Sequence, residues 1–172
     1  MNRNVFFIIC LFALNFAMLD AQTSAQSIKL TNLNNSEIQI PDFGKKMLFI
    51  VYLDPDVEGI TDELTDAINK KGYAQARLGA LGVVNCKDTW IPDKAIITKA
   101  RFMQKKYPES EILLDKSSTL KTNWNIGDCN NVAVIMIVGQ DKKIKFIKKV
   151  KTKEEARIQI SIIMRLLDSE LK

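Results

Sequence analysis

Three apolar stretches dominate the pattern of the chain and predict the centre of a sheet. Residues 47–53 and 132–138 are apolar at every position, and residues 78–84 hold only apolar residues and glycine. A strand that is covered on both faces has this composition, whereas a strand with one solvated face alternates polar and apolar side chains. We therefore expect buried central strands with helices on both faces of the sheet.

Shorter strands surround this centre. Residues 27–30 and 37–40 alternate polar and apolar side chains on either side of a pair of asparagines, which predicts a hairpin at the N-terminus of the domain. Residues 111–115 have the composition of a short strand. A turn leads from the last apolar stretch into residues 144–148, which we expect to form its antiparallel partner.

Three helices are indicated by apolar residues at spacings of three and four and by signals at their ends. The first begins at Thr61 and ends at Gly72. The second spans residues 92–107 and ends before a proline, which disfavours helical backbone at the residue that precedes it. The last begins at a capping box formed by Thr152 and Glu155.

The order of these elements predicts an α/β domain with a central mixed sheet flanked by helices. After an N-terminal β-hairpin, a βαβ unit is followed by two strands and a last helix, and this arrangement resembles the thioredoxin-like fold. No repeat, linker or low-complexity segment interrupts residues 27–172, so we expect one domain over this range.

The resemblance extends from the fold to a family. Residues 84–88 read Val-Asn-Cys-Lys-Asp, Ile-Pro follows at 91–92, and Lys-Lys-Tyr-Pro stands at 105–108. This succession is similar to that of the YtfJ-type periplasmic proteins, and the similarity covers most of residues 27–170. The resemblance implies an exported thioredoxin-like domain. It brings no settled activity and no catalytic residue set.

Residues 1–25 have the features of a secretory signal peptide. Arg3 precedes an apolar run over residues 5–14, which suits the hydrophobic region of a signal peptide and is too short to span a bilayer. Small residues at Ala21 and Ala25 offer cleavage points, and the second is the more regular one. We expect a periplasmic or otherwise exported protein with no stable membrane span after cleavage; an uncleaved N-terminal anchor is the alternative.

Composition excludes several kinds of chemistry. The chain has 172 residues, with 25 Lys and Arg against 20 Asp and Glu, and it has no histidine. The absence of histidine excludes Ser/His/Asp and Cys/His nucleophilic sites, His-ligated zinc and histidine proton switches. The net charge of +5 comes without any nucleic-acid recognition motif, so we expect no nucleic-acid partner.

The hallmark of thioredoxin-like redox enzymes is missing. Those enzymes carry Cys-x-x-Cys where the first apolar strand runs into a helix, because the helix dipole there favours the thiolate. Here the strand over residues 47–53 runs into residues 54–56, which hold no cysteine. The cis-proline that accompanies the motif would fall near Val132 or Ala133. Neither residue is a proline, so we expect a trans peptide bond there. Standard dithiol exchange is excluded, and no cofactor is predicted.

Two cysteines follow the predicted leader, and each has two interpretations. Cys86 comes just after residues 78–84, and Cys129 precedes the last apolar stretch. A catalytic interpretation makes them a relocated redox pair, or makes Cys86 a single reactive thiol whose pKa Lys87 lowers. The alternative makes Cys86 a small buried hydrophobe and Cys129 a loop residue.

Carboxylates before the first helix offer weak candidates for a metal site. Asp54, Asp56, Glu58 and Asp62 fall at ligand positions of a calcium loop. The final position, which normally holds a bidentate glutamate, is Thr65. Acidic residues at this place also complement the positive N-terminus of a helix, so no metal is predicted.

Basic and aromatic residues suggest surfaces for binding. Trp90 and Trp124 stand near predicted loop ends, where they line a pocket or cover the edge of the core. Seven lysines cover the predicted last strand and its flanks, either to contact anionic lipid, peptidoglycan or an acidic partner, or to form a solvated edge that blocks aggregation. These are Lys142, Lys143, Lys145, Lys148, Lys149, Lys151 and Lys153.

Three functional hypotheses follow. The leading one is an exported, non-enzymatic thioredoxin-like domain that binds a protein, a peptide or a small ligand of the cell envelope at the ends of the strands. The second is a thiol-dependent oxidoreductase or peroxidase-like protein that uses Cys86, alone or with Cys129. The third is an interaction protein that uses the basic edge strand.

Overall fold

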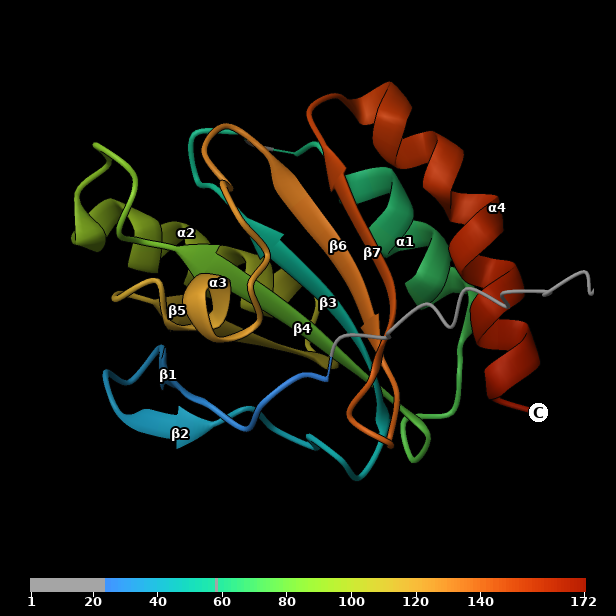
Figure 1. Ribbon diagram of the computed structural model, residues 1–172. Coiled ribbons are helices and arrows are strands. Elements are labelled where there is room, and N and C mark those ends of the chain that lie inside the picture. The colour runs from blue at the N-terminus through green and yellow to red at the C-terminus, as the bar shows by residue number, and fades with distance from the viewer. Residues whose placement is uncertain (1–23, 58) are drawn as a thin grey trace, which may run out of the picture.

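The computed structural model describes residues 24–57 and 59–172 (Figure 1). Glu58 and residues 1–23, which hold nearly all of the predicted signal peptide, lie outside the described residues. The strands are β1 (Lys29–Asn32), β2 (Glu37–Gln39), β3 (Met47–Leu53), β4 (Leu78–Asn85), β5 (Ser110–Asp115), β6 (Ala133–Val138) and β7 (Ile144–Val150). The helices are α1 (Asp62–Lys71), α2 (Asp93–Lys106), α3 (Thr119–Asn123) and α4 (Lys153–Glu170).

The strands form one mixed sheet in the order β2-β1-β5-β4-β3-β6-β7. The three strands β3, β4 and β5 run parallel to one another. On one side β6 pairs antiparallel with β3, and β7 pairs antiparallel with β6. On the other side the β1–β2 hairpin pairs antiparallel with β5 through β1. The predicted mixed sheet and N-terminal hairpin are therefore confirmed. The parallel arrangement brings the carboxyl ends of β3, β4 and β5 to one edge of the sheet.

The fully apolar stretches lie at the centre of the sheet because both of their faces are covered. Every residue of β6 is buried, and so is every residue of β3 except Leu53. Helices α1, α2 and α4 pack on one face, while α3 and the segments around it cover the other (Figure 1). None of the helices in the described residues combines the length and the apolar composition that a bilayer crossing requires.

The helix ends follow the predicted signals with two differences. Gly72 ends α1 in the left-handed conformation, with φ of 68°, as expected for a glycine stop signal. Thr61 stands at the N-cap of α1, but its side chain makes no capping hydrogen bond. At α4, Thr152 accepts the Glu155 N–H at 3.2 Å, while the Glu155 carboxylate accepts the N–H of Lys151 rather than that of the cap.

Helix α3 is the element that the sequence pattern does not reveal. It has only five residues, too few for a period to show. Leu120 and the adjoining Trp124 are buried, and the Trp124 indole N–H donates to the Gln26 carbonyl at 2.9 Å. Trp124 therefore covers the core, as one of its two interpretations held, whereas Trp90 is 84% exposed.

Strand β7 lies at an edge of the sheet, and its lysines point largely to solvent. Lys148 and Lys149 are exposed, whereas Lys145 is half-buried and pairs with Asp141 at 3.1 Å. Lysines on an edge strand oppose pairing with another chain, so this arrangement fits the solvated-edge interpretation.

The N-terminal segment adds to this same edge. Ser24 forms an antiparallel bridge with Lys143, and the Ala25 N–H donates to the Lys142 carbonyl at 2.8 Å. The Ala25 side chain is only 3% exposed and packs in the core beside α3. Ser24 and Ala25 thus belong to the folded domain, and cleavage after Ala25 would remove both.

We expect a chain that begins at Gln22, as cleavage after Ala21 would leave it, to be more stable than one that begins at Gln26. The difference in the free energy of unfolding should be about 1–2 kcal/mol, for one buried methyl group and one hydrogen bond. Urea unfolding of the two purified chains measures it, with a chain from Ser24 as the control that should match the longer one. Equal stabilities of all three chains would show that this pairing contributes nothing.

Candidate functional site

Each of the three parallel strands ends at a buried polar residue. Asp54 directly follows β3, Asn85 ends β4 and Asp115 ends β5, and their exposed fractions are 0%, 0% and 1%. The carboxyl edge of parallel strands is where open α/β sheets place ligands, so this edge is the first candidate site. Buried polar groups are costly unless hydrogen-bonded, and their partners show what each one does.

Asp54 joins the end of β3 to the loop before β6. One carboxylate oxygen accepts the Asn131 N–H at 2.6 Å, and the other accepts the Asp56 N–H at 2.9 Å. The Asp54 backbone N–H in turn donates to the Val132 carbonyl at 3.2 Å. The side chain that stands where the dithiol motif would begin is therefore a structural clamp on the loop that holds Cys129.

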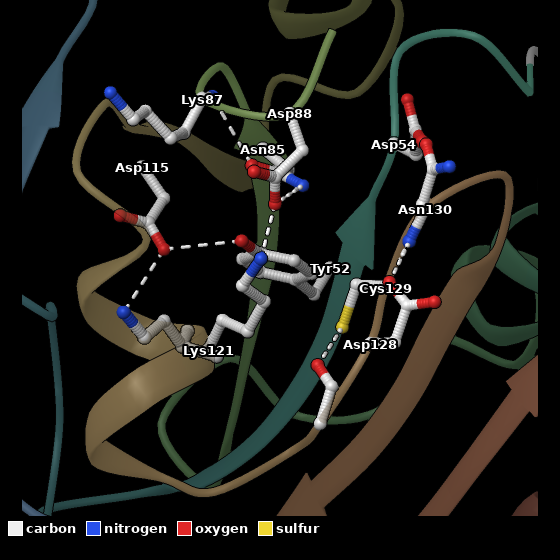
Figure 2. Close-up of polar contacts among 12 residues, drawn as sticks. Tyr52, Asp54, Asn85, Lys87, Asp88, Asp115, Lys121, Asp128, Cys129 and Asn130 are labelled. Carbon is white, nitrogen blue, oxygen red and sulfur yellow. Dashed lines mark hydrogen bonds and ion pairs between the residues drawn. The ribbon is translucent and has the colours of Figure 1, made fainter.

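Asp115 holds α3 against the sheet. Its carboxylate accepts the N–H groups of Thr119 at 2.6 Å and Leu120 at 3.0 Å. It also accepts the Tyr52 hydroxyl at 3.2 Å (Figure 2). These contacts satisfy the free N–H groups at the start of the helix. Burial, reinforced by the negative charge of Asp115, raises the pKa of Tyr52, so this phenol stays protonated as a hydrogen-bond donor.

The buried Asn85 connects this cluster to Asp88, which lies exposed at its outer side. The Asn85 amide donates to the Asp88 carboxylate at 3.2 Å, and its oxygen accepts the Lys87 N–H (Figure 2). Lys121 of α3 forms an ion pair with Asp88. The hydrogen bond from Lys121 lowers the pKa of the Asp88 carboxyl below its usual value. Among the described residues, no buried side-chain polar atom lacks a hydrogen-bond partner, so the edge is fully satisfied internally.

The two cysteines lie in different parts of the core. Cys86 packs beneath α2 on one face of the sheet, while Cys129 belongs to the apolar cluster beside α3 on the opposite face. Both are free thiols. The sheet lies between the two clusters, so the structure does not bring the predicted redox pair together.

Neither thiol has the surroundings of a nucleophile. Burial, with a smaller contribution from Asp93, raises the pKa of the Cys86 thiol to about 12. Lys87, which was expected to lower the pKa of Cys86, is not among the charged groups that shift it. Burial also raises the pKa of Cys129, against the opposing effect of Lys149 and Lys121, and its thiol contacts the Gly127 carbonyl at 3.3 Å. Both therefore stay protonated at neutral pH.

The described carboxylates of the acidic segment do not converge on a shared metal position. Asp54 is engaged by backbone N–H groups, Asp56 accepts the Thr89 hydroxyl at 3.0 Å, and Asp62 faces Lys106 at 3.8 Å. Glu58 lies outside the described residues. Within residues 24–57 and 59–172, no group of three or more His, Cys, Asp or Glu side chains is placed to share a metal ion.

A cavity of about 150 Å³ lies on the helix face of the sheet, between α1 and α2 and over β4. The helix-face core is divided at this place: one apolar cluster lies under α1 and α4, and another lies under α2. Mid-strand Gly82 contributes no side chain to fill the gap. The apolar lining includes Val51, Leu53, Ile96, Ala100, Met103 and Ile112. Sequence reasoning did not find this cavity, although a glycine inside a buried strand signals close approach of another group.

The similarity of the chain to known proteins covers both sequence and fold. A family described as "Bacterial protein of unknown function (YtfJ_HI0045)" matches residues 55–170, which extend from the segment after β3 to the end of α4. This match agrees with the family expected from the motifs around Cys86. No curated protein matches the chain significantly.

The solved structures with this fold include several thioredoxins. A pneumococcal exposed lipoprotein thioredoxin of Streptococcus pneumoniae is 14% identical over 78% of this chain and 96% of its own, with a TM-score of 0.55. A putative thioredoxin of Neisseria meningitidis is 17% identical over 88% and 95%, with a TM-score of 0.56. A putative protein disulfide isomerase of Bacteroides thetaiotaomicron is 14% identical over 87% and 89%, with a TM-score of 0.59. The fold is therefore thioredoxin-like, as predicted.

We expect Asp54→Ala to lower the free energy of unfolding by about 2–4 kcal/mol, because two backbone N–H groups lose their buried acceptor. The same change should release the loop before β6 and make Cys129 reactive toward iodoacetamide, while Cys86 stays protected. Urea unfolding and mass spectrometry of the alkylated protein measure the two effects.

The matched control for this change is Asp62→Ala, in the same acidic segment. The Asp62 side chain is half-exposed and its ion pair with Lys106 is long, so its removal should cost less than about 1 kcal/mol and leave Cys129 protected. An Asp54→Ala protein with wild-type stability and a protected Cys129 would contradict the assigned role of this carboxylate.

Proposed function

The chain belongs to the YtfJ_HI0045 family of bacterial proteins of unknown function, and on that premise we propose that it is an exported thioredoxin-like binding protein that performs no dithiol exchange. Its ligand is a protein, a peptide or a small molecule of the cell envelope. The signal-like pattern of residues 1–25 supports export. One protein with the same fold is described as an exposed lipoprotein, which places this fold outside the cytoplasm in at least that case.

The state of the two cysteines carries the proposal. Disulfide exchange requires a thiolate that can reach another sulfur. Cys86 and Cys129 lie in apolar clusters on opposite faces of the sheet, and burial raises the pKa of both thiols. The place of the missing dithiol is taken by Asp54, whose carboxylate clamps a loop. The helix-face cavity, in contrast, offers a space that protein atoms leave empty.

An oxidoreductase or peroxidase-like role for Cys86 is the alternative, and the fold alone favours it, because several proteins of this fold are described as thiol-disulfide oxidoreductases. That role needs Cys86 to ionise near neutral pH. A pKa of about 12 leaves a thiolate fraction of roughly one in ten thousand at pH 8.

We expect Cys86 to react with iodoacetamide at pH 8 about three orders of magnitude more slowly than a free cysteine, whose pKa is about 8.5. Cys129, whose pKa burial also raises, should likewise react more slowly than a free cysteine, and both should react at the free rate in 6 M guanidinium chloride. Alkylation across pH 5–9, followed by mass spectrometry of protein purified from an oxidising compartment, gives the two rates separately.

The variant Cys86→Ser/Cys129→Ser provides the functional control and should keep the fold and any ligand binding. A Cys86–Cys129 disulfide in the purified protein, or a Cys86 that reacts with an apparent pKa near 7, would replace the binding proposal with the oxidoreductase one.

A further inference from the structure

We propose that the cavity between α1 and α2 binds a small uncharged apolar molecule, which fills it with an aromatic ring or a branched aliphatic group of about six carbon atoms. This inference rests on the proposed binding function and names the chemical class of the ligand. The lining of the cavity, the glycine in its floor and the sparse packing of helix α2 above it support this assignment.

The size and lining of the cavity determine the class of the ligand. Its volume is about 150 Å³, and apolar side chains of β3, β4, β5 and α2 form most of its wall. An engineered apolar cavity of this volume in another protein stays free of water and binds benzene. A charged or strongly polar group against such a wall would lose its hydrogen bonds to water without replacement. A peptide would bring backbone N–H and C=O groups to the same wall, so the occupant is a small molecule.

The charged side chains described at the cavity already have partners within the domain. Asp62 forms an ion pair with Lys106 at 3.8 Å, and Lys99 is engaged as well. The Tyr107 hydroxyl donates to the Asp66 carboxylate at 2.7 Å. Among the described residues, the apolar wall is therefore the main surface that the cavity offers to a ligand, and apolar contact rather than charge selects the occupant.

The cavity exists because the middle of β4 carries no side chain. Gly82 lies there, between Val51 of β3 and Ile112 of β5. A Cβ atom built at Gly82 would meet only Ile112, at an ordinary contact distance of 3.6 Å, so the packing leaves room for a larger residue. The backbone of Gly82 is not in the left-handed region, so its conformation does not require glycine either. Glycine weakens a strand interior, and its effect at this position is to leave the space open.

Helix α2 packs on the sheet through few buried side chains. Of its 14 residues Ile96 and Ala100 are buried, whereas α4 buries four of its 18. Both Ile96 and Ala100 line the cavity, so they border empty space as well as the sheet. A ligand in the cavity would supply the apolar contacts that α2 lacks, and its binding would hold the helix more firmly against the sheet.

The test is a titration of the mature protein with benzene and toluene, with benzoate and benzylamine as charged controls of similar size. Chemical shifts of backbone amides give both the dissociation constants and the place of binding. Burial of about six apolar carbons supports a dissociation constant for benzene below about 1 mM. The methyl group of toluene should tighten binding by up to about fourfold. Each charged control should bind at least about tenfold more weakly than toluene, and the shifts should concentrate on β4 and α2.

Amide hydrogen exchange provides a second readout, which reports on helix α2. Amides of α2 that exchange when the helix leaves the sheet should exchange about tenfold more slowly at a toluene concentration ten times its dissociation constant, because only the closed state binds.

Three variants fill the cavity from opposite walls. Gly82→Ala and Gly82→Val fill it from the sheet in two steps, and Ala100→Leu fills it from α2. Affinity for toluene should fall about fourfold in Gly82→Ala and at least about tenfold in the other two, as added carbons take the place of the ligand. The thermal unfolding midpoint of Gly82→Ala should be unchanged or higher. Lys105→Leu places the same leucine on α2 at an exposed residue outside the cavity lining, and it should bind toluene like the wild type.

The inference is overturned if neither benzene nor toluene binds at millimolar concentration, if benzoate or benzylamine binds as tightly as toluene, or if the filled variants bind toluene normally. In the first case the cavity is a packing gap, and a gain in stability of Gly82→Ala would accompany it. Such a failure leaves the cysteine alkylation result untouched, so the proposed binding function would survive with a different ligand. A reactive Cys86, conversely, would overturn the proposed function without affecting this titration.

Discussion

The Asp54 carboxylate is the interaction on which the rest of the carboxyl edge depends. It is fully buried and accepts two backbone N–H groups, one from its own segment and one from Asn131 before β6. Without it, the loop that places Cys129 would have no bond to the end of β3 other than backbone pairing. The segment directly after β3, which holds no cysteine, therefore serves to hold the fold. The buried Asp115 does the same two strands away, at the end of β5, between Tyr52 and α3.

This arrangement of the strand ends supports the proposal that the domain performs no dithiol exchange. Among the described residues, every buried polar side chain at the strand ends has a hydrogen-bond partner within the protein. The unfilled space of the domain lies instead on the helix face, where Gly82 leaves a gap between two apolar clusters. The strand ends still border this gap through Leu53 and Pro55, which connects the rigid edge to the cavity. An internally hydrogen-bonded edge beside an unfilled cavity supports the proposed binding function.

The sequence predicted what is encoded locally and repetitively. Apolar runs gave β3 and β6, alternation gave the hairpin, and Gly72 and Thr152 marked helix ends, because each signal acts within a few residues. It could not show that Cys86 and Cys129 face opposite sides of the sheet, since that depends on how distant segments pair. Helix α3 was missed because a buried carboxylate, rather than a helical pattern, holds its start. The cavity was not predicted because Gly82 indicates an unfilled space only when the side chains that surround it in the fold are known.

The measurement that tests this account most directly is amide hydrogen exchange at Asn131, whose N–H donates to Asp54. If the buried carboxylate clamps the loop, this amide exchanges only when the whole domain unfolds, with the same free energy as the central amides of β3 and β6. In the Asp54→Ala protein it should exchange by local opening, while the central amides follow the lower global stability. Rapid exchange of the Asn131 amide in the wild type would contradict the account, because the edge would then be mobile and the loop of Cys129 free to open.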